Sequence, residues 1–387
     1  MSGFFISIKF IFATMQFSDI IGQSNLKQVK QYHSFYFPAI DGLRFFAFLL
    51  VFIYHLSPFS HANFFTTIGW TGVHLFFLLS GFLLTRLLVE EYKQSGTLHL
   101  YKYFIRRILR IWPLYFTYLF IVTIASLLLT DHPFSLQRLL GNLFFCDNIL
   151  IAFHWFNPNL VTGHLWSMSL EEQYYLVLPF LIPWLVKQKK EKIKMFILII
   201  FFILFATRFL LVILHTKYAT VYVLPFSADC FVAGIVLGLG IFDPWIKKIN
   251  TVLACGAGTA LLIVVYFLPP PTDMGPHIIL IYFILAVAFF FLFIAVVYGN
   301  TRFLQPVFTN KPVRYLGKIS FGLYVFHVAA NYTATYFYSQ LGRTMDPGVP
   351  LLSLAITISL AIVSYELLEK RFLKMKSRFT IIKNRDI

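Results

Sequence analysis

The chain has 387 residues, of which 59% are hydrophobic and only 12% are charged, and its mean hydropathy is +0.76. A soluble domain cannot bury that much apolar surface, so the composition excludes a soluble protein and predicts an all-α polytopic membrane protein. The formal net charge is +16, but the basic residues form short clusters between apolar segments, as in cytoplasmic loops. This distribution argues against a nucleic-acid partner. The three cysteines lack metal-ligand spacing, so we predict no metal site.

Apolar runs of about 20 residues predict ten transmembrane helices. Basic residues gather in every second loop, and this asymmetry fits an even number of spans with both termini in the cytoplasm. We therefore place the chain in the lipid bilayer of the cell inner (cytoplasmic) membrane. The predicted spans are 39–58, 70–90, 111–130, 164–186, 195–214, 221–242, 251–268, 278–298, 319–339 and 350–368.

Three regions follow from these spans. Residues 1–38 are an N-terminal cytoplasmic or interfacial segment, residues 39–368 are the transmembrane domain, and residues 369–387 are a basic cytoplasmic tail. The longest outside segment is 131–163. It is either a lid or re-entrant loop over the outer mouth, or an ordinary ordered loop.

The first predicted span carries a basic and a titratable side chain on one face. Arg44 and His55 are eleven residues apart, which is about 1,100° of helical rotation, or three turns plus ~20°, and ~16 Å along the axis. With the N-terminus inside, Arg44 lies towards the inner side and His55 towards the outer side. Ionisable groups within a membrane are costly to bury and indicate a functional site.

The second and third spans add further polar candidates. His74 and Ser80 lie in the second span, where Ser80 and Gly81 also suit close helix packing. At the cytoplasmic entry to the third span lies a cluster of three arginines, which is either a positive-inside anchor or a grip for an anionic ligand such as a phosphate. These arginines are Arg106, Arg107 and Arg110.

The fourth span contains two adjacent carboxylates, Glu171 and Glu172. Helical rise places them ~10 Å below the outer surface, at about the depth of His55. Glu171 shares a face with His164 and Ser167 at i, i+3 and i+7 spacing, so Glu171 is favoured as the inward group. A carboxylate near an imidazole fixes its tautomer and makes it a better general base. The alternative is that one of these carboxylates only pairs with an arginine between helices.

Polar residues in the later spans have more modest expected roles. Arg208 and Asp229 pair with each other or with Arg44, and a structural ion pair is the favoured role for both. In the ninth span, Tyr324 accompanies His327, which is either a cavity residue or a helix–helix hydrogen-bonding group.

Five stretches together resemble the integral-membrane acyltransferase family 3, the O-acetyltransferases that modify bacterial surface glycans and related molecules. They are PAIDGLRFFAFLLVFIYH (38–55), GWTGVHLFFLLSGFLLTRLL (69–88), YFIRRILRIWPLYF (103–116), HLWSMSLEEQYYLVLPFL (164–181) and LGKISFGLYVFHV (316–328). The resemblance implies a ten-helix fold, a cytoplasmic acyl-CoA donor and an outer carbohydrate or glycolipid acceptor. The donor, with acetyl-CoA the usual one, is a co-substrate, and no permanently bound cofactor is expected.

The resemblance also implies roles for single residues. His55 is expected to be catalytic together with Glu171 or Glu172, and Arg44 and the three arginines of the third span are expected to bind the donor. Supporting positions fall to Asp41, His74, Ser80, Ser167, Tyr324 and His327. His55 acts either as a general base on the acceptor hydroxyl or as a transient acyl carrier.

One position departs from the family pattern, because Gly-Val-His occupies 72–74 where the family usually has Gly-Val-Asp. If that Asp orients the catalytic histidine, Glu171 or Glu172 takes over the role here. Some family members carry a fused hydrolase-like domain, which does not follow Leu368. Two alternatives therefore stay open. Either a separate partner protein completes the transfer, or the membrane domain acts alone. The rival functions are an exporter of a glycan or lipid-linked precursor and a scaffold for a polysaccharide synthase.

Overall fold

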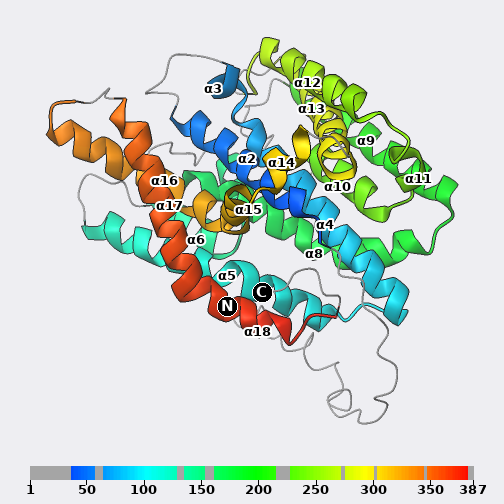
Figure 1. Ribbon diagram of the computed structural model, residues 1–387, viewed down its shortest axis with the longest axis horizontal. Coiled ribbons are helices and arrows are strands. Elements are labelled where there is room, and N and C mark those ends of the chain that lie inside the picture. Colours follow the sequence, from blue (N-terminus) through cyan, green and yellow to red (C-terminus); the bar gives the residue numbers. More distant parts are fainter. Residues whose placement is uncertain are drawn as a thin grey trace, which may run out of the picture. The chain divides into compact units, whose positions relative to one another are not determined.

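The computed structural model describes residues 36–56, 64–128, 135–152, 161–214, 227–271, 275–299, 303–343 and 347–381 (Figure 1). Within these ranges the regular elements are all helices and no strand occurs, which confirms the all-α class. The predicted N-terminal segment lies outside the described residues up to residue 35, as do parts of segment 131–163. The described part of segment 131–163 contains two short helices, α6 (Leu136–Leu143) and α7 (Asp147–Ala152).

A helix overlaps each of the ten predicted spans. These helices are α2 (Pro38–His55), α4 (Thr71–Ser95), α5 (Leu100–Leu128), α8 (Trp166–Val186), α9 (Lys190–Ile213), α10 (Asp229–Leu239), α12 (Thr251–Phe267), α13 (Ile278–Phe293), α16 (Ser320–Gln340) and α17 (Gly348–Ser364). Shorter elements connect them: α3 (Phe64–Ile68), η3 (Gly163–Leu165), α11 (Asp243–Ile246), α14 (Leu304–Thr309), α15 (Lys311–Lys318) and α18 (Lys370–Ser377). Single π-helical segments, η5 (Ile294–Tyr298) and η6 (Tyr365–Glu369), extend α13 and α17.

Six helical stretches of the described chain are long and apolar enough to cross a membrane. They are Pro38–His55, Thr71–Ser95, Leu100–Leu128, Lys190–Ile213, Ile278–Tyr298 and Gly348–Ser377. Two further apolar helices, α10 and α12, are shorter. The chain is therefore a multi-pass membrane protein. The number of ten spans and the cytoplasmic position of the termini stay predictions.

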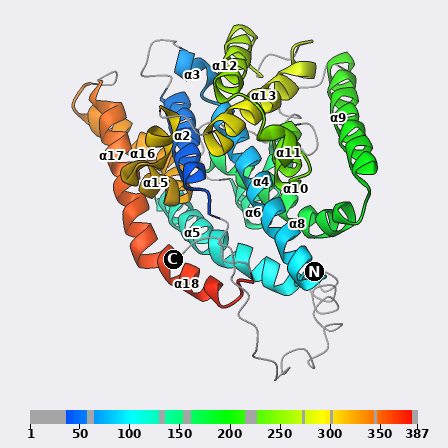
Figure 2. The ribbon, with the colours of Figure 1, turned by 45° about the vertical axis from the view of Figure 1, so that its right-hand side comes forward.

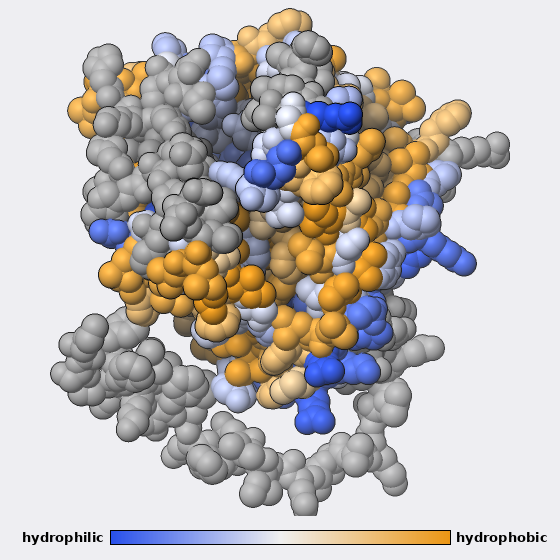
Figure 3. Space-filling model, turned by 90° about the vertical axis from the view of Figure 1, so that its left-hand side faces the viewer, coloured by the Kyte–Doolittle hydropathy of each residue, from blue (hydrophilic) through white to orange (hydrophobic). Residues whose placement is uncertain are grey.

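Large apolar side chains cover much of the described outer surface. Phe120 on α5 is 66% exposed and Phe202 on α9 is 70% exposed. Only 11% of the most apolar stretch of α9 is buried within the protein. Figure 3 shows hydrophobic residues over broad areas of one face. Water would make this exposure unfavourable, whereas lipid chains accommodate it, so these surfaces are lipid-facing.

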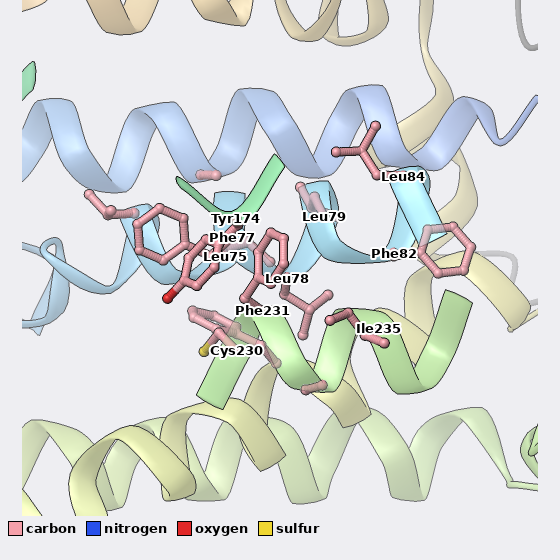
Figure 4. Close-up of a cluster of buried hydrophobic side chains, with 14 of the residues drawn as sticks. Leu75, Phe77, Leu78, Leu79, Phe82, Leu84, Tyr174, Cys230, Phe231 and Ile235 are labelled. Atoms are coloured by element: carbon pink, nitrogen blue, oxygen red, sulfur yellow. The ribbon is translucent and has the colours of Figure 1, made fainter. Parts of the chain in front are cut away.

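Helix α4 is the most deeply buried of the six membrane-crossing stretches, because 72% of its most apolar part is buried within the protein. It packs against α2, α8, α10 and α13, and Figure 2 shows it between α2 and α10. Glycines let α4 and α10 approach closely: a Cβ on Gly81 would collide with the carbonyl of Phe231, and a Cβ on Gly234 with the carbonyl of Leu78. The expected packing role of Gly81 is confirmed. Beside this contact the rings of Tyr174 and Phe231 stack 4.0 Å apart (Figure 4).

Buried ion pairs fix other helix contacts. The predicted pair of Arg208 and Asp229 is confirmed: the guanidinium donates to the carboxylate at 2.5 and 3.1 Å and ties α9 to α10. Arg208 also donates to the carbonyl of Ile279 on α13 at 3.1 Å. A second pair, Arg138 and Asp147, joins α6 to α7 with both side chains almost fully buried. Both arginines are therefore structural, because each neutralises a buried carboxylate.

Candidate functional site

A strongly basic cavity of about 470 Å³ opens among α2, α4, α5 and α18. Seven basic side chains line this large cavity, against two carboxylates, Asp41 and Glu91. The excess of positive charge in a confined space favours a multiply charged anion. The basic residues are Arg44, Arg106, Arg107, Arg110, Lys318, Lys374 and Lys376.

Arg106 and Asp41, two of the predicted residues on this wall, also bind groups of the protein itself. Arg106 forms an ion pair with Glu91 at 2.7 Å and donates a second hydrogen bond to the carbonyl of Phe379 at 2.9 Å. Asp41 accepts a hydrogen bond from the hydroxyl of Tyr36 at 2.8 Å. Arg106 is thus part of the framework that shapes the cavity as well as a charge on its surface.

A smaller cavity of about 90 Å³ adjoins the large one and contains the carboxylate of Glu171 in its wall. Glu171 accepts hydrogen bonds from the hydroxyls of Ser80 and Tyr175. The two cavities share part of their lining, so they are neighbouring compartments of one space. The shared residues are Arg44, Ser80, Arg107, Arg110 and Tyr175.

The predicted depth of Glu171 needs a correction. His164 lies level with His55, because both imidazoles contact the ring of His327, at 5.0 and 4.8 Å between centroids. Glu171 comes seven residues after His164, so helical rise puts it ~10 Å further along α8. It therefore lines the small cavity, as Arg44 does. The prediction starts the outer surface at His164, whereas His164 is buried in the protein.

Three imidazoles, those of His55, His164 and His327, form a cluster at the end of α2 opposite to Arg44. His327 is fully buried and its Nε2 lies 3.3 Å from Nδ1 of His55. Nδ1 of His55 also lies 2.9 Å from the carbonyl oxygen of Val51, and Nδ1 of His327 faces the carbonyl oxygen of Tyr324. A carbonyl oxygen only accepts hydrogen bonds, so both Nδ1 atoms carry a proton. This leaves Nε2 of His55 with a lone pair.

Tyr324 and Ser167 connect the small cavity to these histidines. Both residues line the small cavity, and their hydroxyls are hydrogen-bonded at 2.6 Å. The ring of Tyr324 lies 5.5 Å from that of His164 and 5.4 Å from that of His327. Side-chain contacts therefore run without a break from the basic cavity to His55.

His74 and Glu172, the two remaining predicted residues, line neither cavity. His74 packs against aromatic rings, those of Trp70 at 5.4 Å, Phe77 at 5.8 Å and Tyr282 at 5.1 Å. Glu172 interacts electrostatically with Arg107. His55 takes its orientation from Val51 and His327. The position where the family pattern has Asp thus contributes to aromatic packing in this chain.

Several residues of the site were not predicted from the sequence. Tyr175 follows Glu171 by one helical turn, and this i, i+4 spacing was a usable signal. Glu91, Lys318 and the lysines of α18 come from segments far apart in the chain, and the sequence shows them only as loop charges. Among the described residues, no group of three or more His, Cys, Asp or Glu side chains has a geometry that holds a metal ion.

The fold and the site define a multi-pass membrane protein in which a cavity suited to an anion leads to a histidine cluster. A family model described as an acyltransferase domain matches residues 37–366, so the chain belongs to this acyltransferase family. No solved structure matches the chain.

Named relatives agree with this family. The chain is 28% identical over 371 residues to the peptidoglycan O-acetyltransferase OatA of Listeria monocytogenes, covering 89% of this chain and 57% of the relative. It is 26% identical over 362 residues to the O-acetyltransferase OatA of Staphylococcus aureus, covering 88% of this chain and 58% of the relative. The chain thus spans somewhat more than half the length of these curated relatives.

Proposed function

We propose that this protein moves an acyl group, acetyl being the expected one, from acyl-CoA to a hydroxyl of a carbohydrate or glycolipid across the cytoplasmic membrane. The observation that carries the proposal is the unbroken line of contacts from the basic cavity, through Tyr324, to His55. The names of the relatives support an O-linked acetyl product and a cell-wall glycan acceptor.

The donor fits the charge and order of the two cavities. The pyrophosphate of CoA is bound by Arg107 and Arg110, since guanidinium groups match phosphate oxygens bidentately. Arg44 lies where the cavities adjoin, and the pantetheine arm passes it towards Tyr324. An extended CoA arm bridges most of a ~30 Å hydrocarbon core. The thioester then approaches the histidine cluster while the nucleotide stays on the basic side.

His55 performs the chemistry with the lone pair on Nε2. In direct transfer, Nε2 removes the proton of the acceptor hydroxyl as its oxygen attacks the thioester carbonyl carbon. The carbon–sulfur bond breaks and the CoA thiolate takes the proton from the imidazolium. In a two-step transfer, Nε2 attacks the carbonyl carbon and expels the thiolate. The acceptor oxygen then displaces His55, and the hydroxyl proton passes to the thiolate.

His327 and Glu171 act through other groups. The Nδ1–H of His55 donates to the carbonyl of Val51 and is shared with Nε2 of His327, and the interaction with His327 strengthens when His55 becomes positively charged. Glu171 holds Ser80 and Tyr175 and offsets the charge of Arg44 in the small cavity. His327 is a positioning residue for His55, and Glu171 shapes the donor path.

The test is thiol release from acetyl-CoA by the purified protein, supplied with glycan fragments and followed by mass analysis of the glycan. The wild type is expected to release thiol and form an acetyl ester, and His55→Ala is expected to do neither. His277→Ala serves as the control, because His277 is a half-buried histidine away from the cluster, facing the carbonyl oxygen of Pro270. Full transfer by His55→Ala would overturn the assignment. Glycan movement across a vesicle membrane without thiol release would favour an exporter.

A further inference from the structure

The C-terminal helix supplies one wall of the large cavity. Lys374, Ser377 and Ile381 line it and follow i, i+3 and i+7 spacing, so one face of α18 and the turn after it is directed towards the cavity. Lys376 and Thr380 line the same wall. The sequence predicted only a basic tail here, whose charges mark the cytoplasmic side.

These lysines occupy the part of the wall that does not border the small cavity. Of the basic residues, Arg44, Arg107 and Arg110 line both cavities, whereas Lys374 and Lys376 line the large one alone. An elongated ligand whose reactive end reaches the small cavity therefore has its other end beside α18.

Specific contacts fix α18 and the following residues against the membrane helices. Arg106 on α5 donates to the carbonyl of Phe379 at 2.9 Å while it pairs with Glu91 on α4. The rings of Phe379 and Tyr101 meet edge to face at 6.2 Å, and Leu373 is buried. The backbone that carries the two lysines is therefore held at the cavity wall.

We propose that Lys374 and Lys376 form a binding site for a terminal phosphate monoester, which in the donor is the 3′-phosphate of CoA. The inference rests on the proposed function, because it takes CoA as the ligand and places the thioester end of CoA in the small cavity. In CoA the pyrophosphate lies between the pantetheine arm and the adenosine, and the 3′-phosphate lies furthest from the thioester. The arginines shared by both cavities then meet the pyrophosphate, and the lysines of α18 meet the 3′-phosphate.

The ammonium groups of the two lysines match a phosphate monoester in charge and in hydrogen bonding. A phosphate monoester carries close to two negative charges at neutral pH, and Lys provides a compact positive charge without the fixed geometry of Arg. Charge-assisted hydrogen bonds are the strong ones. Loss of both lysines is expected to weaken CoA binding about 30-fold, and high salt is expected to weaken the wild-type preference for the 3′-phosphate.

The experiment compares CoA with 3′-dephospho-CoA by calorimetric titration of the full chain in detergent. The wild type is expected to bind CoA about 30-fold more tightly than 3′-dephospho-CoA. In Lys374→Ala/Lys376→Ala, CoA affinity is expected to fall to that of 3′-dephospho-CoA, whose own affinity stays unchanged. The matched control is Arg371→Ala/Arg378→Ala, which removes two charges from the same segment at positions that do not line the cavity. This control is expected to keep the wild-type preference.

The outcomes separate the two proposals. If the wild type binds neither ligand, the acyl-CoA donor itself is wrong. If the wild type binds both ligands equally, or the lysine variant weakens both equally, the phosphate site is wrong and the donor proposal stands. Should the alanine variant fail to fold, Lys374→Gln/Lys376→Gln provides the same comparison, and the wild-type preference measured at low and high salt decides independently.

Discussion

Replacing His327 by alanine is expected to slow acyl transfer about tenfold without changing the KM for acyl-CoA. His327 accepts a hydrogen bond from His55 at 3.3 Å, which is long, so its contribution belongs at the lower end of the ~1.5–3 kcal/mol typical of hydrogen bonds to charged groups. At about 1.4 kcal/mol per factor of ten, this corresponds to roughly a tenfold loss of kcat. The KM stays constant because His327 lines neither cavity described above.

His327→Gln is the informative companion variant. Its amide oxygen is able to accept from Nδ1–H of His55, and its volume leaves less empty space beside Phe48, whose ring contacts His327 at 6.3 Å. We therefore expect His327→Gln to retain more kcat than His327→Ala. The assay is initial-rate thiol release over a range of acetyl-CoA concentrations, with thermal unfolding to confirm the fold. Wild-type kcat in His327→Ala, or a loss that appears only in KM, would refute the positioning role.

Three further predictions concern the framework and the donor path. Asp229→Ala removes the carboxylate that pairs with the buried Arg208 and is expected to destabilise the protein by about 3–5 kcal/mol, seen as a lower Tm in detergent, whereas an unchanged Tm would show that the pair adds nothing. Gly234→Leu forces α4 and α10 apart because a Cβ there meets the backbone of α4, so both Tm and activity are expected to fall. The control is Gly256→Leu, where a Cβ meets no other atom, and it is expected to leave both unchanged. Arg44→Ala is expected to raise the KM for acetyl-CoA with a smaller effect on kcat, and an unchanged KM would show Arg44 to be structural.

Local pattern was sufficient to predict the helices and one ion pair. A helix overlaps each predicted span because apolar runs of that length must satisfy their backbone groups internally in lipid. The pair of Arg208 and Asp229 is one of the two alternatives that the sequence offers, the other being a pairing with Arg44, because each is a charge within an apolar segment and needs a counter-charge. The shared face of Arg44 and His55 followed from helical rotation alone.

Contacts between segments that are far apart in the chain could not be predicted from the sequence. The neighbours of Glu171 depend on how α4 and α8 pack, because Ser80 on α4 donates to Glu171 on α8 only when both helices are in place. The depth of His164 is set by burial among other histidines rather than by the start of an apolar run. Lys374 lines the large cavity only because the chain after α17 returns to α5.

The central claim is that the donor enters on the basic side and the acceptor is modified on the opposite side. The most direct measurement uses proteoliposomes captured by a tag at the C-terminus, so that the face bearing α18 is outward, with glycan acceptor enclosed. Acetyl-CoA added outside is expected to acetylate the enclosed glycan, and His55→Ala vesicles are expected to leave it unmodified. Acetylation that requires donor and acceptor on the same face of the membrane would contradict the account.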